Sequence, residues 1–471
     1  MNYPDLTNLI KSYDVRGVVG EDLTHDIATA IGAAFADAVV LPERERTVVI
    51  GHDMRDTSPG LTAAVTEGLT SRGVDVVLMG LTSTDGLYFA SGHLDIPGVM
   101  ITASHNPAEY NGMKMCRSRA RAVGENSGLG DVRDLTARYL AEGWDRASAP
   151  GATSSRPLIA EYAALLRGLV PLDGSRPLKV VVDAANAMGG YTVPIVLGTE
   201  GGLPALPLDI VPLYFELDGT FPNHEANPLD EENLRDLQAA VLEHGADIGL
   251  AFDGDADRCF VVDERGHIVR ASAITALVGL REVARVGVEK GAPSVVYNTV
   301  SSMAVPELLG AAGAVTWRSK VGHSNVKAIM AREDAVFGGE HSAHFYFRDF
   351  WYADSGMLAA MHVLAALGES DAPLSQLLST YDPYPASGEI NSIVADVPEA
   401  TRRIVEGFAG EGVSLDEVDG VRISHWESEP HWWISVRPSG TEPLLRLNVE
   451  AADLSVMEQI RDRALAIIRE G

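Results

Sequence analysis

Three stretches of the chain repeat the same order of apolar and polar positions. Each begins with a β-branched run that ends in a polar loop: TVVIGHDMRDTS from Thr47, KVVVDAANAMGG from Lys179 and SVVYNTVSS from Ser294. In the first two stretches, apolar residues at helical spacing follow, with Leu61, Val65 and Leu69 before Gly73, and Leu234, Leu237 and Val241 before Gly245. The pattern therefore predicts a strand followed by a helix in each stretch.

A second short apolar run in each stretch leads into a loop of unusual polar composition. These runs are GVMITASHNP from Gly98, DIGLAFDGDADR from Asp247 and AVFGGEHSAH from Ala335. Strands that alternate with helices predict parallel α/β layers, whose ligands bind beyond the carboxyl ends of the strands. Repetition on this scale predicts three similar domains that present three comparable loops.

The pattern changes after about Ser387. An amphipathic stretch at 402–408 precedes the apolar runs HWWISV and LLRLNVEA, which flank the loop RPSGTEP, and a helical stripe with Val456, Ile460, Ala464 and Ile467 ends the chain. Two strands joined by a loop and backed by helices predict a small α+β domain. The Ala/Ser/Pro/Gly-rich stretch 147–155 is the best candidate for a linker.

The predicted fold class is α/β, with three similar mixed α/β domains and a small C-terminal α+β domain around one central cleft. We expect domain 1 at residues 1–154, domain 2 at 155–267, domain 3 at 268–385 and domain 4 at 386–471. Their loops would be the serine loop (102–107), the carboxylate loop (253–258), the glycine-rich loop (338–344) and the arginine loop (437–443), respectively. A length of 471 residues agrees with about three or four domains.

Composition narrows the class of protein. No run of about 18 apolar residues is evident, and the N-terminus lacks the basic and apolar regions of a signal peptide. Cys116 and Cys259 are too few for a disulfide framework, so we expect a cytoplasmic protein. The net charge of −29 argues against nucleic acid or an anionic membrane as a partner, and leaves both a monomer and a homodimer open.

The loop 253–258, DGDADR, carries the strongest chemical signal. Asp253, Asp255 and Asp257 alternate after an apolar run, so their oxygens can converge on one hard cation such as Mg²⁺ or Ca²⁺. An EF-hand is disfavoured because Arg258 occupies the position that requires glycine and no helix precedes the loop. A phosphatase of the haloacid dehalogenase type shares the strand and Asp-x-Asp, but not the residues that follow. A solvated acidic turn is the third interpretation.

The other three loops are ambiguous when each is taken alone. TASHNP at 102–107 places a hydroxyl beside an imidazole, although such residues also form ordinary turns. RPSGTEP from Arg437 combines a guanidinium, hydroxyls and glycine, as in an anion site or a polar hairpin turn. GGEHSAH at 338–344 has donors and acceptors suited to sugar hydroxyls, or is a glycine-rich turn. Together with the carboxylate loop, they predict a nucleophile, a metal site, a phosphate clamp and a polar reader in one cleft.

The order of these motifs resembles that of the α-D-phosphohexomutases, and within them the bacterial phosphomannomutase/phosphoglucomutase group. The resemblance covers essentially the whole chain, and it includes KSYDVRG at 11–17 and YNGMK at 110–114. It implies an intramolecular phosphotransferase of the isomerase class that interconverts hexose 1-phosphate and hexose 6-phosphate, of mannose or glucose. It also implies a phosphoserine enzyme, bound Mg²⁺ and a hexose 1,6-bisphosphate intermediate that acts as activator.

The resemblance also implies roles for individual residues. Ser104 would carry the phosphoryl group and would bind the metal together with Asp253, Asp255 and Asp257. The other catalytic groups would be Arg16, His105, Lys114 and Arg258. The substrate would contact Tyr13, His323, Glu340, Ser342, His344, Arg437, Ser439, Gly440 and Thr441. Glu340, Ser342 and His344 would read sugar hydroxyls, while the residues from Arg437 to Thr441 would hold the phosphate that is not transferring.

Two loops depart from the family pattern. Many members have Met and Gly where this chain has His341 and Ala343, a change that can tune the choice between mannose and glucose. The loop 80–85, GLTSTD, lacks the proline usual after its last threonine, and Asp85 stands there instead. Two rival functions stay open: a phosphatase that forms an aspartyl-phosphate on Asp253 with Asp255 as acid/base, and a sugar-phosphate sensor with a vestigial site.

Overall fold

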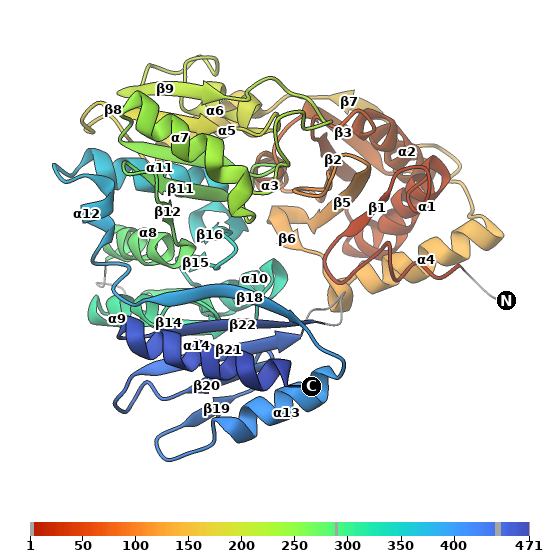
Figure 1. Cartoon of the computed structure of the whole chain (residues 1–471). Helices are drawn as coiled ribbons and strands as arrows, with labels where there is room; N and C mark the ends of the chain where they lie inside the picture. The colour runs from red at the N-terminus through yellow and green to blue at the C-terminus, as the bar shows by residue number, and fades with distance from the viewer. Residues whose placement is uncertain (1–3, 288–290, 439–443, 471) are drawn as a thin grey trace. The chain divides into compact units, whose positions relative to one another are not determined.

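The structure is a computed structural model that describes residues 4–287, 291–438 and 444–470. Figure 1 shows the course of the chain, which divides into two compact units. The first unit contains residues 1–269 and 342–377, and the second contains residues 270–341 and 378–471.

The first sheet of the first unit is covered by helices. Its strands follow the order β1 (Val15–Val18), β5 (Tyr110–Arg117), β4 (Gly98–Ile101), β2 (Thr47–His52), β3 (Asp75–Leu81) and β7 (Thr153–Ser155), with β6 (Arg121–Ala122) beside β5. Its helices are α1 (His25–Phe35), α2 (Ser58–Ser71), α3 (Thr84–Leu94) and α4 (Leu129–Glu142). Val48 and Ile50 share a core with α1, α2 and α4, whereas Val49 and Leu87 of α3 both lie within 3.5 Å of a Cβ built on Gly98. Alternate residues of β2 therefore serve the two faces of the sheet.

The parallel pairing predicted from the repeats is only part of this sheet. Strand β2 pairs in parallel with β3 and β4, but β4 pairs antiparallel with β5, and β5 with β1. The helix predicted around Leu61, Val65 and Leu69 is confirmed as α2. The sheet is therefore mixed, and the antiparallel hairpin β4–β5 carries the serine loop at its turn.

Helix α1 corrects one expectation from the sequence. Within the described residues, the helical segment from His25 to Glu43 is long and apolar enough to cross a membrane, with a mean hydropathy of 1.2. In the structure 56% of this segment is buried, and α1 packs on α2 and α4. A Cβ built on Gly68 of α2 would lie 2.1 Å from the carbonyl oxygen of Thr29. Such close backbone contact is typical of a helix in the core of a domain.

The stretch 147–155 was expected to be a linker, but part of it belongs to the sheet. Its end forms β7, which pairs in parallel with β3. The N–H of Ala152 donates to Asp75 Oδ1 at 2.7 Å, and a Cβ on Gly151 would lie 1.9 Å from the carbonyl oxygen of Val74. Small residues in this stretch therefore permit close packing against the sheet edge, which composition alone does not distinguish from flexibility.

The second sheet of the first unit delivers the carboxylate loop. Its strands follow the order β12 (Ile268–Val269), β11 (Cys259–Asp263), β10 (Ile248–Phe252), β8 (Leu178–Asp183) and β9 (Leu208–Leu213). Its helices are α5 (Ile159–Leu169), α6 (Gly189–Val196) and α7 (Arg235–His244). Helix α7 confirms the prediction and ends at Gly245, whose φ of 55° is left-handed. Leu234 lies in the 3₁₀ turn that precedes it.

Residues 342–377 complete the first unit. They form β16 (Phe345–Phe347), β17 (Ala353–Asp354), α11 (Gly356–Gly368) and most of α12 (Leu374–Leu378). Helix α11 is buried along its whole length and begins at Ser355, whose Oγ accepts a hydrogen bond from the Leu358 N–H. This capping serine also takes part in the network around the candidate site.

The second unit contains two layers of its own. Strand β13 (Ser294–Asn298) pairs in parallel with β14 (Val315–Ser319) and β15 (Phe337–Gly339), with helices α8 (Ala271–Val286), α9 (Ala304–Ala311) and α10 (His323–Glu333). The C-terminal sheet has the order β18 (Ala386–Ile393), β22 (Leu444–Ala451), β21 (Trp432–Pro438), β20 (Val421–Ser424) and β19 (Ser414–Asp416). Helices α13 (Val397–Gly407) and α14 (Leu454–Arg469) share its apolar core.

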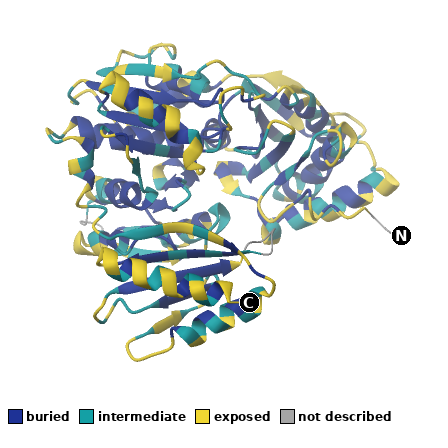
Figure 2. Ribbon diagram, in the orientation of Figure 1, coloured by how far each residue is buried: buried dark blue, intermediate teal, exposed yellow. Residues whose placement is uncertain are grey.

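The C-terminal sheet is larger than the sequence predicted. Strands β21 and β22 were expected, but β18, β19 and β20 were not. Strand β18, ASGEINSI, is largely exposed, and β19 has only three residues, so neither shows the alternation that marks a half-buried strand. Figure 2 shows the contrast between the buried central strands and the exposed outer elements of each layer.

Candidate active site

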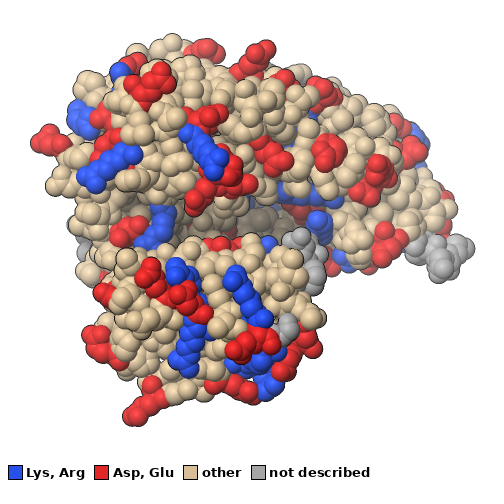
Figure 3. All heavy atoms as spheres, in the orientation of Figure 1, with Lys and Arg blue, Asp and Glu red and all other residues tan. Residues whose placement is uncertain are grey.

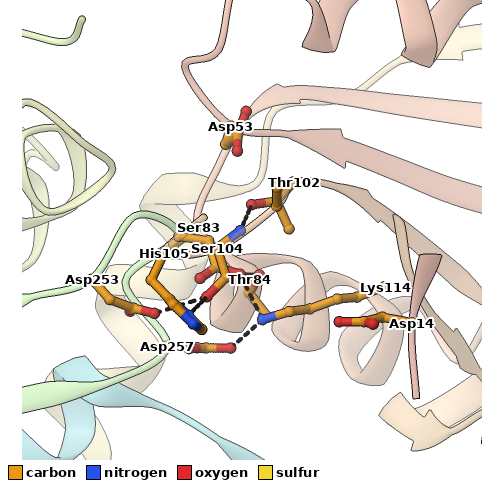
Figure 4. A network of polar contacts seen from close by, with 12 residues as sticks. Asp14, Asp53, Ser83, Thr84, Thr102, Ser104, His105, Lys114, Asp253 and Asp257 are labelled. Atoms are coloured by element: carbon orange, nitrogen blue, oxygen red, sulfur yellow. Dashed lines mark hydrogen bonds and ion pairs between the residues drawn. The ribbon is translucent and has the colours of Figure 1, made fainter. Parts of the chain in front are cut away.

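Ser104 lies at the turn between β4 and β5, in a conformation that its surroundings impose. Its φ of 51° is left-handed, which is uncommon for a residue with a Cβ. The Ser104 N–H donates to Thr102 Oγ1 at 2.9 Å (Figure 4). Its Oγ donates to Asp253 Oδ2 at 2.9 Å and lies 3.3 Å from His105 Nδ1. The hydroxyl of the predicted nucleophile therefore points at the carboxylate loop.

The carboxylates of Asp253, Asp255 and Asp257 converge after β10. One ligand oxygen from each lies within 4.8 Å of the others, and all three residues are buried. Among the described residues, Asp255 Oδ1 and Asp257 Oδ1 have no hydrogen-bond partner. Buried oxygens without partners are costly, and an all-oxygen donor set suits a hard divalent cation. The strand that precedes the loop agrees with the rejection of an EF-hand.

The serine loop and the carboxylate loop meet at Gly254. A Cβ built on Gly254 would lie only 2.1 Å from the carbonyl oxygen of Ser104. Glycine is therefore required here by close backbone approach.

Two basic residues compensate the carboxylates. Lys114 Nζ of β5 lies 2.6 Å from Asp255 Oδ2 and 2.5 Å from Asp257 Oδ2 (Figure 4). Arg258 Nη2 lies 2.8 Å from Asp253 Oδ2. Burial opposes ionisation of Asp255 and Asp257, but the charge of Lys114, together with other favourable contacts, lowers the pKa of both. Burial raises the pKa of Asp253 although Arg258 opposes the effect.

His105 is held as a neutral ring. Burial and the positive charges of Arg258 and Arg16 lower the pKa of His105. Arg258 Nη2 contacts His105 Nδ1, so this nitrogen acts as an acceptor. Arg16 of β1 donates to Asp14 Oδ2 at 2.7 Å and to the carbonyl oxygen of Ala103 at 3.2 Å. The structure thus brings the predicted catalytic groups together around Ser104.

The predicted sugar-binding residues are divided between the units. In the first unit, His344 Nε2 lies 3.7 Å from Asp257 Oδ1, and Ser342 Oγ lies 3.0 Å from His344 Nδ1. Ala343 between them has a left-handed φ of 63°, a conformation that glycine adopts more readily than alanine. Tyr13 is 38% exposed and precedes β1.

Glu340, His323 and Arg437 belong to the second unit. Glu340 is buried and its Oε1 accepts from the Gly322 N–H at 2.8 Å, beside His323 at the start of α10. Arg437 of β21 lies 3.1 Å from Glu389 Oε2 and 3.6 Å from Asp419 Oδ2. Ser439, Gly440 and Thr441 lie outside the described residues.

The contact of Thr84 with the carboxylate loop was not predicted from the sequence. Its Oγ1 donates to Asp255 Oδ2 at 2.5 Å, and its N–H donates to the Asp255 carbonyl at 3.0 Å. The N-terminus of α3 therefore fixes the central carboxylate of the loop.

Asp85, next to Thr84, is a second missed residue. It is fully buried and accepts hydrogen bonds from Tyr162 Oη at 2.7 Å and from Ser355 Oγ at 2.6 Å, and it also contacts Ser83 Oγ. Three hydroxyls from three separate segments thus converge on one carboxylate. Burial raises the pKa of Asp85 to about 6, against the effect of these hydrogen bonds. The missing proline in GLTSTD was the signal that marked this position.

Figure 3 shows acidic and basic side chains interspersed over the face of the molecule that is in view. Comparison with known proteins then settles the family. Residues 7–129, 160–266 and 272–384 match the α/β/α domains I, II and III of phosphoglucomutase/phosphomannomutase, and residues 389–467 match its C-terminal domain. The chain belongs to this family.

Whole-chain relatives agree with the family match. A phosphomannomutase of Salmonella typhimurium is 39% identical to this family member over 98% of both chains. A protein of Xanthomonas campestris named phosphohexose mutases is 37% identical over 98% of this chain and 99% of its own. The solved structure of a phosphoglucomutase/phosphomannomutase family protein from Burkholderia thailandensis superimposes with a TM-score of 0.85 at 29% identity, covering 99% of this chain and 98% of that chain. The chain is an isomerase with the three α/β domains and C-terminal domain of the family.

The buried Asp85 of this phosphohexomutase-family enzyme predicts a pH-dependent stability. Because the pKa of Asp85 is higher in the folded than in the unfolded state, its contribution to stability is present at acid pH and is lost as the pH rises through about 6. The free energy of unfolding of the wild type minus that of Asp85→Asn should fall by about 1 kcal/mol from pH 5 to pH 7, measured by denaturant titration with chelator present. Asp173→Asn, at an exposed position, is the control and should show no trend. A constant difference for Asp85→Asn would contradict this prediction.

Proposed function

We propose that this enzyme interconverts hexose 1-phosphates and hexose 6-phosphates, of mannose, glucose or both, through a phosphoserine on Ser104. The observation that carries the proposal is the Ser104 hydroxyl, which donates to Asp253 in a loop of three convergent carboxylates flanked by Lys114 and Arg258. The relatives named phosphomannomutase supply the substrate class. A cytoplasmic location agrees with Cys116 and Cys259, which are buried and form no disulfide.

In the first step, the bond between phosphorus and Ser104 Oγ breaks while a bond forms to the free hydroxyl of the sugar. The hydroxyl proton leaves to a base, and a hexose 1,6-bisphosphate results. The bisphosphate then presents its other phosphate: a bond forms between that phosphorus and Ser104 Oγ, the bond to the sugar oxygen breaks, and the sugar oxygen regains a proton. Such transfers need placement and charge neutralisation. The chain itself would supply positive charge for this neutralisation through Arg16, Lys114 and Arg258.

We propose Mg²⁺ as the metal of the carboxylate loop, held by Asp253, Asp255, Asp257 and an oxygen on Ser104. Its oxygen-only donors and the two buried oxygens without hydrogen-bond partners support a hard cation. When bound, the ion would polarise the transferring phosphoryl group and stabilise the serine oxygen. Lys114, which already compensates Asp255 and Asp257, would keep the loop assembled between metal-bound and metal-free states.

The nucleophile is tested by Ser104→Ala. Loss of the attacking oxygen should abolish conversion of mannose 1-phosphate and glucose 1-phosphate, and intact-mass analysis should no longer detect a phosphorylated chain after incubation with hexose 1,6-bisphosphate. Ser127→Ala, an exposed serine of the same domain, should retain both properties. Wild-type turnover by Ser104→Ala, or phosphate found on Asp253 in place of Ser104, would refute the proposal and favour the aspartyl-phosphate alternative.

The metal is tested by removal and by Asp255→Asn. Excess chelator should abolish turnover and added Mg²⁺ should restore it, while Asp255→Asn should weaken Mn²⁺ binding measured by electron paramagnetic resonance at least tenfold. Asp263→Asn, which keeps a buried polar side chain beyond the loop, is the matched control and should bind Mn²⁺ like the wild type. Full activity in chelator would show that the carboxylate loop is structural.

Arg437 is the proposed clamp for the phosphate that is not reacting. Its guanidinium faces Glu389 and Asp419, and its side chain is 8% exposed. A phosphate dianion would compete with these carboxylates for the same donors, because bidentate binding to Arg is charge-assisted. Arg437 should serve 1-phospho and 6-phospho sugars alike, since each presents its distal phosphate.

Arg437→Ala should therefore raise KM for both substrates by roughly 10- to 100-fold, and should make turnover depend on added hexose 1,6-bisphosphate because the intermediate escapes. Arg437→Lys should recover only part of the loss. Glu389→Gln should act in the opposite direction and lower KM, because it removes a competing charge. Unchanged KM values in Arg437→Ala, measured by steady-state kinetics, would remove Arg437 from the site.

A further inference from the structure

Arg55, at the turn after β2, binds the backbone of the serine loop along its length. Arg55 is buried, with 1% of the residue exposed to solvent. One guanidinium nitrogen, Nη1, donates to the carbonyl oxygens of Pro107 at 2.7 Å and Tyr110 at 2.9 Å. The other, Nη2, donates to those of Ser104 at 3.0 Å and Asn106 at 2.6 Å. One side chain thus satisfies four carbonyls of the loop that carries the nucleophile.

These bonds meet a specific need of the loop. Ser104 has a left-handed φ of 51°, and a strained residue persists only where its surroundings determine it. The carbonyl of Ser104 is also the oxygen that Gly254 of the carboxylate loop approaches. A shift of this carbonyl would displace the Ser104 hydroxyl and the carboxylate loop together.

Arg55 is itself fixed from two sides. Its Nε lies 3.3 Å from Asp53 Oδ2, and Asp53 Oδ1 accepts from the Arg55 N–H at 3.0 Å and from Ser58 Oγ at 2.5 Å. Figure 4 shows Asp53 beside the serine loop. The guanidinium also lies 5.1 Å from the centre of the Phe221 ring, which comes from the segment between β9 and α7.

The Phe221 segment packs closely on the Arg55 turn. A Cβ on Gly219 would lie 2.8 Å from Arg55 Cα, and Ala226 from the same segment lies near Gly254. The Phe221 ring, from the segment that follows β9 of the second sheet, therefore covers the face of the guanidinium. The N–H groups at the edge of the guanidinium donate to carbonyls of the first sheet's serine loop and of the strand after it. This arrangement joins both sheets of the first unit to the serine loop.

We propose that Arg55 is a positioning residue that holds the Ser104 hydroxyl in its attacking geometry, with Phe221 as its cover. The proposal rests on the proposed function of Ser104. It requires arginine in particular, because a planar guanidinium presents five N–H donors, whereas a lysine ammonium presents three from one point. Arg55 acts through the loop and does not contact the reacting atoms.

The test uses Arg55→Met, Arg55→Lys and Phe221→Leu in the full chain. Misplacement of a reacting group by about 1 Å can cost 10²-fold, so Arg55→Met should lower kcat about 100-fold, and Arg55→Lys about tenfold, with KM for hexose phosphate changed less than threefold. Phe221→Leu keeps the carbonyl bonds and should lower kcat about threefold. If Arg55→Met fails to fold, the loss of kcat in Phe221→Leu tests the proposal in its place.

Arg167→Lys is the matched control. Arg167 likewise donates to three backbone carbonyls, those of Val196, Gly198 and Pro204, but in the second sheet's layer away from Ser104. This variant should keep wild-type kcat even where its melting temperature falls. A loss of kcat in Arg167→Lys equal to that in Arg55→Lys would show a general loss of stability and overturn the proposal.

Hydrogen exchange provides a readout that does not depend on turnover. In Arg55→Lys, amides of peptides that cover residues 102–110 should exchange at least tenfold faster than in the wild type, while in Arg167→Lys the change should fall on residues 196–204. Unchanged exchange at 102–110, or kcat within threefold of wild type in Arg55→Met, would overturn the inference. An inactive wild type with faster exchange in Arg55→Lys would refute the proposed function and leave the positioning role standing.

Discussion

Three buried carboxylates in one short loop impose the constraint on which the candidate site depends. Asp253, Asp255 and Asp257 are each at most 1% exposed. An uncompensated buried charge costs several kcal/mol, so the loop can be stable only if positive groups come from elsewhere in the fold. Lys114 from β5 and Arg258 from the loop's own end meet that requirement. Two cations against three carboxylates leave room for a further positive charge, which a divalent ion would provide.

The same constraint explains why the serine loop and the carboxylate loop are built together. Lys114 lies on the strand that follows the Ser104 turn, and it pairs with carboxylates that follow β10, so the first sheet compensates charge on the second. Ser104 and Ala256 both have left-handed φ angles, 51° and 58°, in the two loops that meet. Strain of about 1–3 kcal/mol at each is held by the ion pairs and carbonyl hydrogen bonds around them. The site is therefore stiff before substrate binds, as electrostatic catalysis requires.

Sequence reasoning found the parts of this site that are local in the chain. The alternating Asp residues, the serine loop and the strands before them are all legible in segments of about ten residues, because strand periodicity and loop composition are local signals. Arg55 and Asp85 were missed because their roles consist of contacts with partners 49 to 270 positions away. Strands β7 and β18 were not predicted, although both pair at the edge of a sheet. Such pairing depends on backbone hydrogen bonds, and an edge strand can form them without an apolar pattern that the sequence would reveal.

The groups that the proposed chemistry would use are divided between the two compact units. Ser104 and the carboxylates belong to one unit, Arg437 to the other, and the chain passes between units inside GEHSAH, between His341 and Ser342. The reacting phosphate would meet buried groups whose partners are already fixed. The distal phosphate would meet an arginine already paired with Glu389 and Asp419. Those carboxylates can reoccupy the guanidinium when the phosphate leaves, so its release would not strand a buried charge.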